Sequence, residues 1–251
     1  MLAEHASDRA VLSVSGSDAW DFLQGLVTND LDHLKSGLVY AALLSPQGKY
    51  LFDFVMFERG GAICLDVRTD RADALAARLS MYRLRADVQI EKTALKVFRG
   101  LGDAPADGLQ DPRSARLGWR SYGDGEGGDS VTDWDAIRVA ELIPETGVEL
   151  IENDSYILEC GFERLNGVDF RKGCYVGQEV TARMKHKTEL RKGLARVTLD
   201  RPVATGTAVL SGEREIGTIR TIAGTNAIAY LRFDQAQGDL KAGEASVTVS
   251  G

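Results

Sequence analysis

The side chains best suited to chemistry are concentrated in residues 166–187, NGVDFRKGCYVGQEVTARMKHK. Cys174 stands here between Gly173 and Gly177, close to Lys172, and basic residues follow. A thiol near cations or near a helix N-terminus has a lowered pKa, which favours the reactive thiolate. The segment QEVTARM predicts a short helix whose free N–H groups point back towards the thiol. We therefore expect Cys174 to be reactive; the alternative is a buried and inert cysteine.

The other cysteines and the histidines indicate no second site. Cys64 and Cys160 lie in the apolar runs GAICLDV and YILECGF, which is typical of core residues. Three widely spaced cysteines without a C-x-x-C pair argue against a disulfide framework and against a zinc site. His186 follows Cys174 in the chain, but nothing in the sequence fixes it as a base. We expect the protein alone to hold no metal.

Charge is distributed unevenly along the chain. The whole protein carries a net charge of −7, whereas residues 164–192 hold eight basic and three acidic side chains. A local basic patch on an acidic protein suits a compact anionic ligand better than a long polyanion. The alternative is a solvated basic face that binds nothing. A nucleic-acid partner is disfavoured because the remainder is acidic and the patch has no interleaved aromatic residues.

Several function classes lack their sequence signatures. The chain has no G-x-S-x-G or P-loop motif, and its one G-x-G-x-x-G match, at 123–128, lies in a Gly/Asp-rich segment expected to be a loop. Hydrolases, NTPases and dinucleotide enzymes are therefore disfavoured. No apolar run approaches the ~20 residues that a membrane span needs. The start of the chain has no basic region followed by an apolar one, as a secretory signal would. We expect a cytoplasmic protein without a membrane partner.

The surrounding pattern predicts the elements that position Cys174. Alternating apolar residues predict strands, and apolar residues at helical spacing after a polar cap predict helices. The expected elements are a strand and a short helix ending near Gly25 within 11–34, a three-stranded meander over 38–68, a helix over 69–84 capped by Thr69, strands in ADVQIEK and ALKVFRG, loops over 102–114 and 123–130, and a helix over 132–142 capped by Thr132.

The last quarter of the chain has a different pattern. From about residue 190, short strands alternate with turn residues, as in a small antiparallel barrel. The sequence therefore predicts an α+β domain over residues 1–189 and a β-barrel module over 190–251. Cys174 lies close to this junction, and ligand sites are frequent at domain interfaces.

The segment KGCYVGQE (172–179) resembles the signature of the YgfZ family. This family is the bacterial branch of the folate-binding superfamily that includes glycine-cleavage T-protein, an aminomethyltransferase, and its mitochondrial relatives assist iron–sulfur cluster assembly. Matching segments follow the same order at 15–31, 42–54, 143–150 and 158–174. The resemblance implies the T-protein fold, with intertwined α+β subdomains around a folate channel and a C-terminal antiparallel β-barrel. It also implies tetrahydrofolate, or another folate derivative, as cofactor.

The resemblance carries residue roles to the matching positions of this chain. Cys174 and Lys172 match the characteristic cysteine and lysine and are expected to be catalytic. The other motif residues are expected to complete the site, and three of them to contact folate: Tyr175, Gln178 and Glu179. Arg183, with Lys185 and Lys187, is expected to pair with the glutamate tail of folate.

Three further residues are implied as folate contacts. Glu159 matches the T-protein glutamate that holds the pterin ring, although Ile157 replaces the arginine that precedes it. Asp53 falls near the T-protein catalytic aspartate, with Phe52 in place of the first acid of that pair. It is expected to face the pterin edge or N5; the alternative is an outward polar residue on a strand. Asn29 is expected to line the channel or to cap a helix.

The function predicted from the resemblance is a tetrahydrofolate-binding accessory protein that supports iron–sulfur cluster assembly or repair. Its expected partners are iron–sulfur enzymes or assembly proteins. One-carbon scavenging by folate and thiol exchange with a damaged cluster both remain open, so enzymatic activity stays open too. The alternative is a folate-dependent aminomethyltransferase, disfavoured by Phe52, Ile157, the short chain and the cysteine motif. A third is an RNA-contacting factor that uses residues 164–192.

Overall fold

The computed structural model describes residues 3–186 and 189–250. The chain divides into two compact units, one of residues 1–132 and 163–178, the other of residues 133–162 and 179–251. The sequence predicted a single boundary between residues 189 and 190. The observed division differs because residues 133–162 belong with the C-terminal strands, so the chain leaves and re-enters the first unit.

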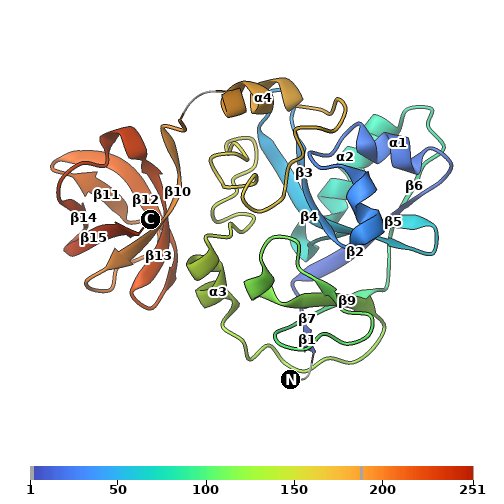
Figure 1. Ribbon diagram of the computed structural model, residues 1–251, viewed down its shortest axis with the longest axis horizontal. Helices are drawn as coiled ribbons and strands as arrows, with labels where there is room; N and C mark the ends of the chain where they lie inside the picture. Colours follow the sequence, from blue (N-terminus) through green and yellow to red (C-terminus); the bar gives the residue numbers. More distant parts are fainter. Residues whose placement is uncertain (1–2, 187–188, 251) are drawn as a thin grey trace. The chain divides into compact units, whose positions relative to one another are not determined.

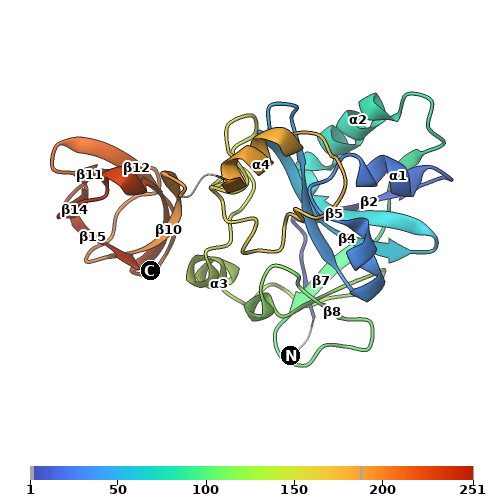
Figure 2. The same cartoon turned by 45° about the horizontal axis from the view of Figure 1, so that its top comes forward.

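The first unit contains a five-stranded antiparallel sheet with strand order β3-β4-β5-β2-β6. Its strands are β3 (Val39–Leu44), β4 (Tyr50–Arg59), β5 (Ala62–Arg68), β2 (Arg9–Ser15) and β6 (Gln89–Lys92). The first three form the predicted meander. Helices α1 (Ala19–Gln24) and α2 (Ala72–Arg83) cover one face of this sheet and bury Leu23, Leu75 and Leu79 against it (Figure 2). Such burial of apolar side chains is the main stabilising contribution to the unit.

A second, four-stranded sheet completes this unit in the order β1-β7-β9-β8. Its strands are β1 (Glu4–His5), β7 (Lys96–Gly100), β9 (Trp119–Gly123) and β8 (Leu109–Gln110). The predicted strand in ALKVFRG is β7.

Buried ion pairs join the two sheets. Asp66 on β5 accepts hydrogen bonds from Arg9 on β2 and Arg120 on β9, each at 2.7 Å. Arg120 also donates to Asp111 at 2.7 Å, and Asp111 pairs with Arg113 at 2.8 Å. Burial acts to raise the pKa of both carboxyl groups, but the neighbouring guanidinium groups outweigh it and hold each pKa below its usual value. We call these five residues the arginine–aspartate network.

The second unit is built on a closed antiparallel barrel of strand order β10-β13-β12-β11-β14-β15 (Figure 1). Its strands are β10 (Lys192–Leu199), β13 (Asn226–Arg232), β12 (Arg214–Ala223), β11 (Ala208–Ser211), β14 (Leu240–Ala242) and β15 (Ala245–Ser250). The barrel predicted from about residue 190 is therefore present. Helix α3 (Trp134–Glu141) packs against β12 and β13.

Two predicted helix caps are wrong. Thr69 begins a 3₁₀ turn, Thr69–Arg71, and α2 starts only after it. The cap of α3 is Asp133, whose carboxylate accepts the Ala136 N–H at 2.9 Å. Thr132 does not cap this helix because its hydroxyl donates instead to Glu4 at 2.6 Å. Within the described residues, no helix is long and apolar enough to cross a membrane.

Candidate functional site

Cys174 lies in the first unit on the segment 163–178 and is exposed, whereas Cys64 and Cys160 are buried. The alternative of a buried Cys174 is therefore wrong. Gly177 fixes the loop against the β3–β4 turn: its φ is +84°, and an added Cβ would lie 2.7 Å from the Ser45 carbonyl oxygen. Only glycine fits there without strain. An added Cβ on Gly173 would meet nothing within 4 Å.

Lys172 anchors the cysteine loop. Its Nζ donates to the carbonyl oxygens of Gln24 at 2.8 Å, Val27 at 2.6 Å and Asn29 at 2.9 Å. All three ammonium donors are thereby used. Burial lowers the pKa of Lys172 to about 8. The ammonium of Lys172 is therefore held by backbone carbonyls, and its predicted catalytic role beside Cys174 stays a prediction.

Asp169 shapes the loop just before Lys172. Its Oδ1 accepts the Arg171 N–H at 2.7 Å, and its Oδ2 lies 2.9 Å from His33 Nε2. Burial acts to raise the pKa of Asp169, but the hydrogen bonds from the Arg171 amide and from His33 outweigh it, so that pKa is lowered. Neither Asp169 nor His33 was predicted as a site residue. An aspartate two residues before the amide it accepts is a known turn signal and could have identified Asp169.

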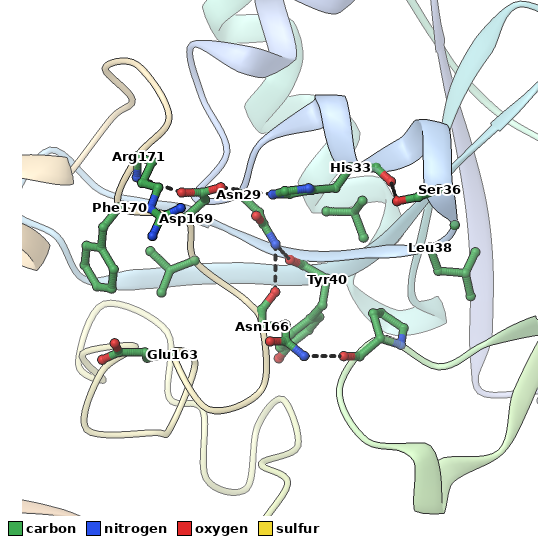
Figure 3. A pocket seen from close by; sticks show the side chains of 14 residues that line it. Asn29, His33, Ser36, Leu38, Tyr40, Glu163, Asn166, Asp169, Phe170 and Arg171 are labelled. Atoms are coloured by element: carbon green, nitrogen blue, oxygen red, sulfur yellow. Dashed lines mark hydrogen bonds and ion pairs between the residues drawn. The ribbon is translucent and has the colours of Figure 1, made fainter.

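A pocket of about 580 Å³ lies beside this loop, within the size range of small-molecule sites (Figure 3). Its walls are the 3₁₀ turn Leu31–Ser36, the start of β3, Pro112 and the segment 163–171. We call it the His33 pocket. Asn29 is part of its wall: the amide donates to the carbonyls of Tyr40 at 2.8 Å and Asn166 at 2.7 Å, and Oδ1 accepts the Asp30 N–H. Asn29 therefore holds the pocket in shape.

Asp53 is buried and holds two tyrosines. Its Oδ2 accepts from the Tyr40 hydroxyl at 3.0 Å and its Oδ1 from the Tyr50 hydroxyl at 2.7 Å. Burial, with the Asp53 charge second, raises the pKa of Tyr40 well above its usual value. The alternative of an outward polar residue is wrong. A pterin could bond Asp53 only by competing with these tyrosines, so the carboxylate fits a folate contact poorly.

Glu159 belongs to the second unit and is also buried. Its Oε2 accepts from the Tyr230 hydroxyl at 2.6 Å, and Lys192 Nζ lies 3.8 Å away. Burial and this hydrogen bond raise the pKa of Tyr230 above its usual range. Among the described residues, none hydrogen-bonds to Oε1. Glu159 thus keeps one fixed and one available oxygen, which fits the N–H donors of a pterin edge.

The backbone around Glu159 is also tightly fixed. Its carbonyl oxygen accepts the Leu194 N–H at 2.9 Å. A Cβ added to Gly193 would approach that oxygen to 2.7 Å, so glycine allows β10 to lie this close. Sequence reasoning missed Tyr230, whose partner depends on barrel register.

The remaining predicted residues lie on or beside helix α4 (Gln178–His186). This helix confirms the one predicted over QEVTARM. Tyr175 is buried, with its ring 5.3 Å from Lys172 Nζ. Glu179 and Arg183 form an exposed pair at 2.8 Å, which leaves both accessible to solvent. Lys187 lies outside the described residues.

The predicted site residues are shared between the two units. Asn29, Asp53, Lys172, Cys174, Tyr175 and Gln178 belong to the first, and Glu159, Glu179 and Arg183 to the second. Among residues 3–186 and 189–250, no group of three or more histidine, cysteine, aspartate or glutamate side chains is placed to hold a metal ion.

The chain is similar in sequence to one family model and to several known proteins. The family model of the CAF17 C-terminal beta-barrel domain matches residues 191–251. The iron–sulfur cluster assembly factor IBA57 of mouse mitochondria is 31% identical over 279 residues, which cover 92% of this chain and 78% of that protein. The human protein is 31% identical over 277 residues, with the same coverage. This chain belongs to the YgfZ/IBA57 family.

Among solved structures, the chain resembles the glycine cleavage system aminomethyltransferase T from Bartonella henselae. The TM-score is 0.76 at 15% identity, over 98% of this chain and 84% of that one. The T-protein fold predicted for this YgfZ/IBA57 family member is thereby confirmed. The IBA57 relatives are named mitochondrial, and a cytoplasmic location for this chain stays a prediction.

Proposed function

We propose that this protein supports the assembly or repair of iron–sulfur clusters through Cys174, with tetrahydrofolate as its cofactor. The relatives that share 31% of aligned residues over most of both chains are named iron–sulfur cluster assembly factors. The observation that carries the proposal is the exposed Cys174 thiol on a loop that a buried ammonium anchors at three carbonyls.

This anchoring suits a thiol that must meet a partner. Lys172 is two residues from Cys174, and its hydrogen bonds fix where the loop leaves the core. Gly177 fixes the other side of the thiol against the β3–β4 turn. A thiol held between two fixed points loses little conformational freedom when it contacts a cluster or a partner protein, which favours association.

Among the predicted folate contacts, Glu159 gives the strongest support for tetrahydrofolate as the cofactor. Glu159 presents Oε1 while Tyr230 holds Oε2, so it would bond the pterin N–H and amino donors. Arg183 and Lys185 would meet the glutamate tail. When bound, the folate supplies a one-carbon acceptor. Asp53 is not part of the proposed folate site, because both its oxygens accept from tyrosine hydroxyl groups.

The proposal is tested by replacing the thiol in cells that lack the endogenous protein. We expect Cys174→Ser to lower the activity of iron–sulfur dehydratases to the level of the deletion strain, because serine is a poor cluster ligand and nucleophile. Cys64→Ala is the matched control, because Cys64 is buried in β5. Wild-type dehydratase activity with Cys174→Ser at equal protein abundance would refute the role of this thiol.

A further inference from the structure

A second, smaller hollow adjoins the His33 pocket. It has a volume of about 260 Å³ and shares residues 36–38, Pro112 and Asn166 with the larger pocket. Its remaining wall includes Asp111 and Arg113, one end of the arginine–aspartate network. Both hollows are built entirely from the first unit.

The charged groups of this wall belong to the arginine–aspartate network. In the arginine–aspartate network, three guanidinium groups form ion pairs with two carboxylates. Each of these five side chains is at least nine-tenths buried. A buried charge is costly unless it is paired. Asp111 is shared by Arg113 and Arg120, so neither guanidinium has this carboxylate to itself.

One nitrogen of the Arg113 guanidinium, Nη1, is not used in its contacts with Asp111 and Tyr40. Its Nε and Nη2 both donate to Asp111, at 3.0 and 2.8 Å, and its guanidinium lies 5.5 Å from the Tyr40 ring centre. In the described part of the chain, Nη1 has no hydrogen-bond acceptor. A guanidinium held on one edge by a carboxylate and on one face by an aromatic ring is pre-organised to bind an oxyanion.

Asn29 and Asp169 of the larger pocket are already engaged, whereas Arg171 also lines it and is exposed. Asn29 uses its amide and its oxygen within the wall, and Asp169 accepts from the Arg171 amide and His33. Glu163 is a further carboxylate of the lining, and it lies on the side away from Leu38 (Figure 3). Arg113 differs from Arg171 because it is buried and held by Asp111, which makes it the fixed cation of the two hollows.

We propose that the two hollows bind a small organic anion. Its apolar or aromatic body lies in the His33 pocket against Tyr40 and Leu38, and its carboxylate or phosphate accepts from Arg113 Nη1 in the smaller hollow. The site requires neither Cys174 nor a cluster, so it stands or falls independently of the proposed function.

The test uses phenyl phosphate and phenylacetate as probes, with benzyl alcohol as the neutral control. We expect both anions to bind the full-length protein roughly tenfold or more tighter than the alcohol. We also expect them to shift the side-chain amide resonance of Asn166, which lines both hollows. The tighter of the two anions identifies the head group as phosphate or carboxylate.

Two variants locate the anion. Arg113→Gln removes the donor and leaves two guanidinium groups with two carboxylates, so we expect the fold to persist and anion affinity to fall roughly tenfold. Asn166→Asp adds a negative charge at an exposed position and should lower the affinity for both anions to a similar extent. Arg214→Gln, in the barrel, is the control and should change nothing.

The proposal is overturned if benzyl alcohol binds as tightly as the anions or if the Asn166 amide does not respond. It is also overturned if both pocket variants bind like the wild type. Displacement of phenyl phosphate by tetrahydrofolate would overturn it too, because the hollows would then be part of the folate site.

Discussion

Lys172 and Cys174 differ in how far their environments follow from the sequence. A reactive thiol was predicted from the flanking glycines and neighbouring cations, and Cys174 is exposed. The position of the Lys172 ammonium could not be predicted, because its partners are the backbone carbonyls of residues 24, 27 and 29, which any residue type provides. The pairings of Asp53 with Tyr40 and of Glu159 with Tyr230 were missed because they depend on strand register.

Glu159 leads to a prediction for the folate site. We expect Glu159→Gln to weaken tetrahydrofolate binding by about 1.5–3 kcal/mol, the usual contribution of a hydrogen bond to a charged group. Calorimetric titration of the two proteins measures this difference. Glu215→Gln is the control, since Glu215 is an exposed residue of β12. Equal affinity of wild type and Glu159→Gln would remove the carboxylate from the proposed site.

Strands and helices were predicted more successfully than their ends. Alternation of apolar residues correctly indicated the meander β3-β4-β5 and the strands of the barrel, because one or both faces of each strand are buried. The caps at Thr69 and Thr132 were wrong because remote segments compete for these residues. Thr132 donates to Glu4, which is 128 positions away in sequence. The local helix-capping preference of a threonine contains no information about a hydrogen-bond acceptor so far away in the sequence.

The glycines flanking Cys174 provide a matched pair of substitutions. Gly177→Ala should destabilise the protein by about 1–2 kcal/mol, because its φ of +84° is unfavourable for a residue with Cβ and because Ser45 blocks the space. Thermal unfolding should show a decrease in Tm of about 2–4 °C per kcal/mol.

Gly173→Ala is the control for this prediction. An added Cβ there meets no atom within 4 Å, and its φ is outside the left-handed region. We therefore expect a Tm close to that of the wild type. If the two variants had the same Tm, the contact between the cysteine loop and the β3–β4 turn would not contribute to stability.

For the whole molecule, composition correctly indicated an α+β region and a β-module but misplaced the division. Residues 133–162 belong with the barrel because of buried polar contacts made far along the chain. Glu149 accepts from Arg138 of α3 at 3.3 Å and from the Thr221 hydroxyl of β12 at 2.5 Å. Nothing in the composition of residues 133–162 indicates these partners, so a division at one point was the simplest prediction.

The arginine–aspartate network makes stability depend on pH. The pKa values of Asp66 and Asp111 are lowered in the folded protein, so their contribution to stability is complete above the unfolded value of about 4. It is lost as pH falls towards the folded values, because the unfolded chain then binds more protons. Urea unfolding at neutral pH and near pH 3 should show this loss.

A substitution separates this network from other carboxylates. Asp111→Asn should cost about 3–5 kcal/mol at neutral pH, because it leaves buried guanidinium groups without their partner. It should also reduce the difference in stability between neutral and acidic pH. An unchanged difference would show that carboxylates elsewhere cause the acid sensitivity.

The accessibility of the three thiols has a practical consequence for spectroscopy. Only Cys174 of the three is exposed, and the others are enclosed in different units. A fluorophore or spin label with a maleimide group can therefore be attached at one defined place in the native protein, without replacing any residue. Such a label would lie two residues from the anchored Lys172, and its signal would report the binding of a partner at this surface in real time.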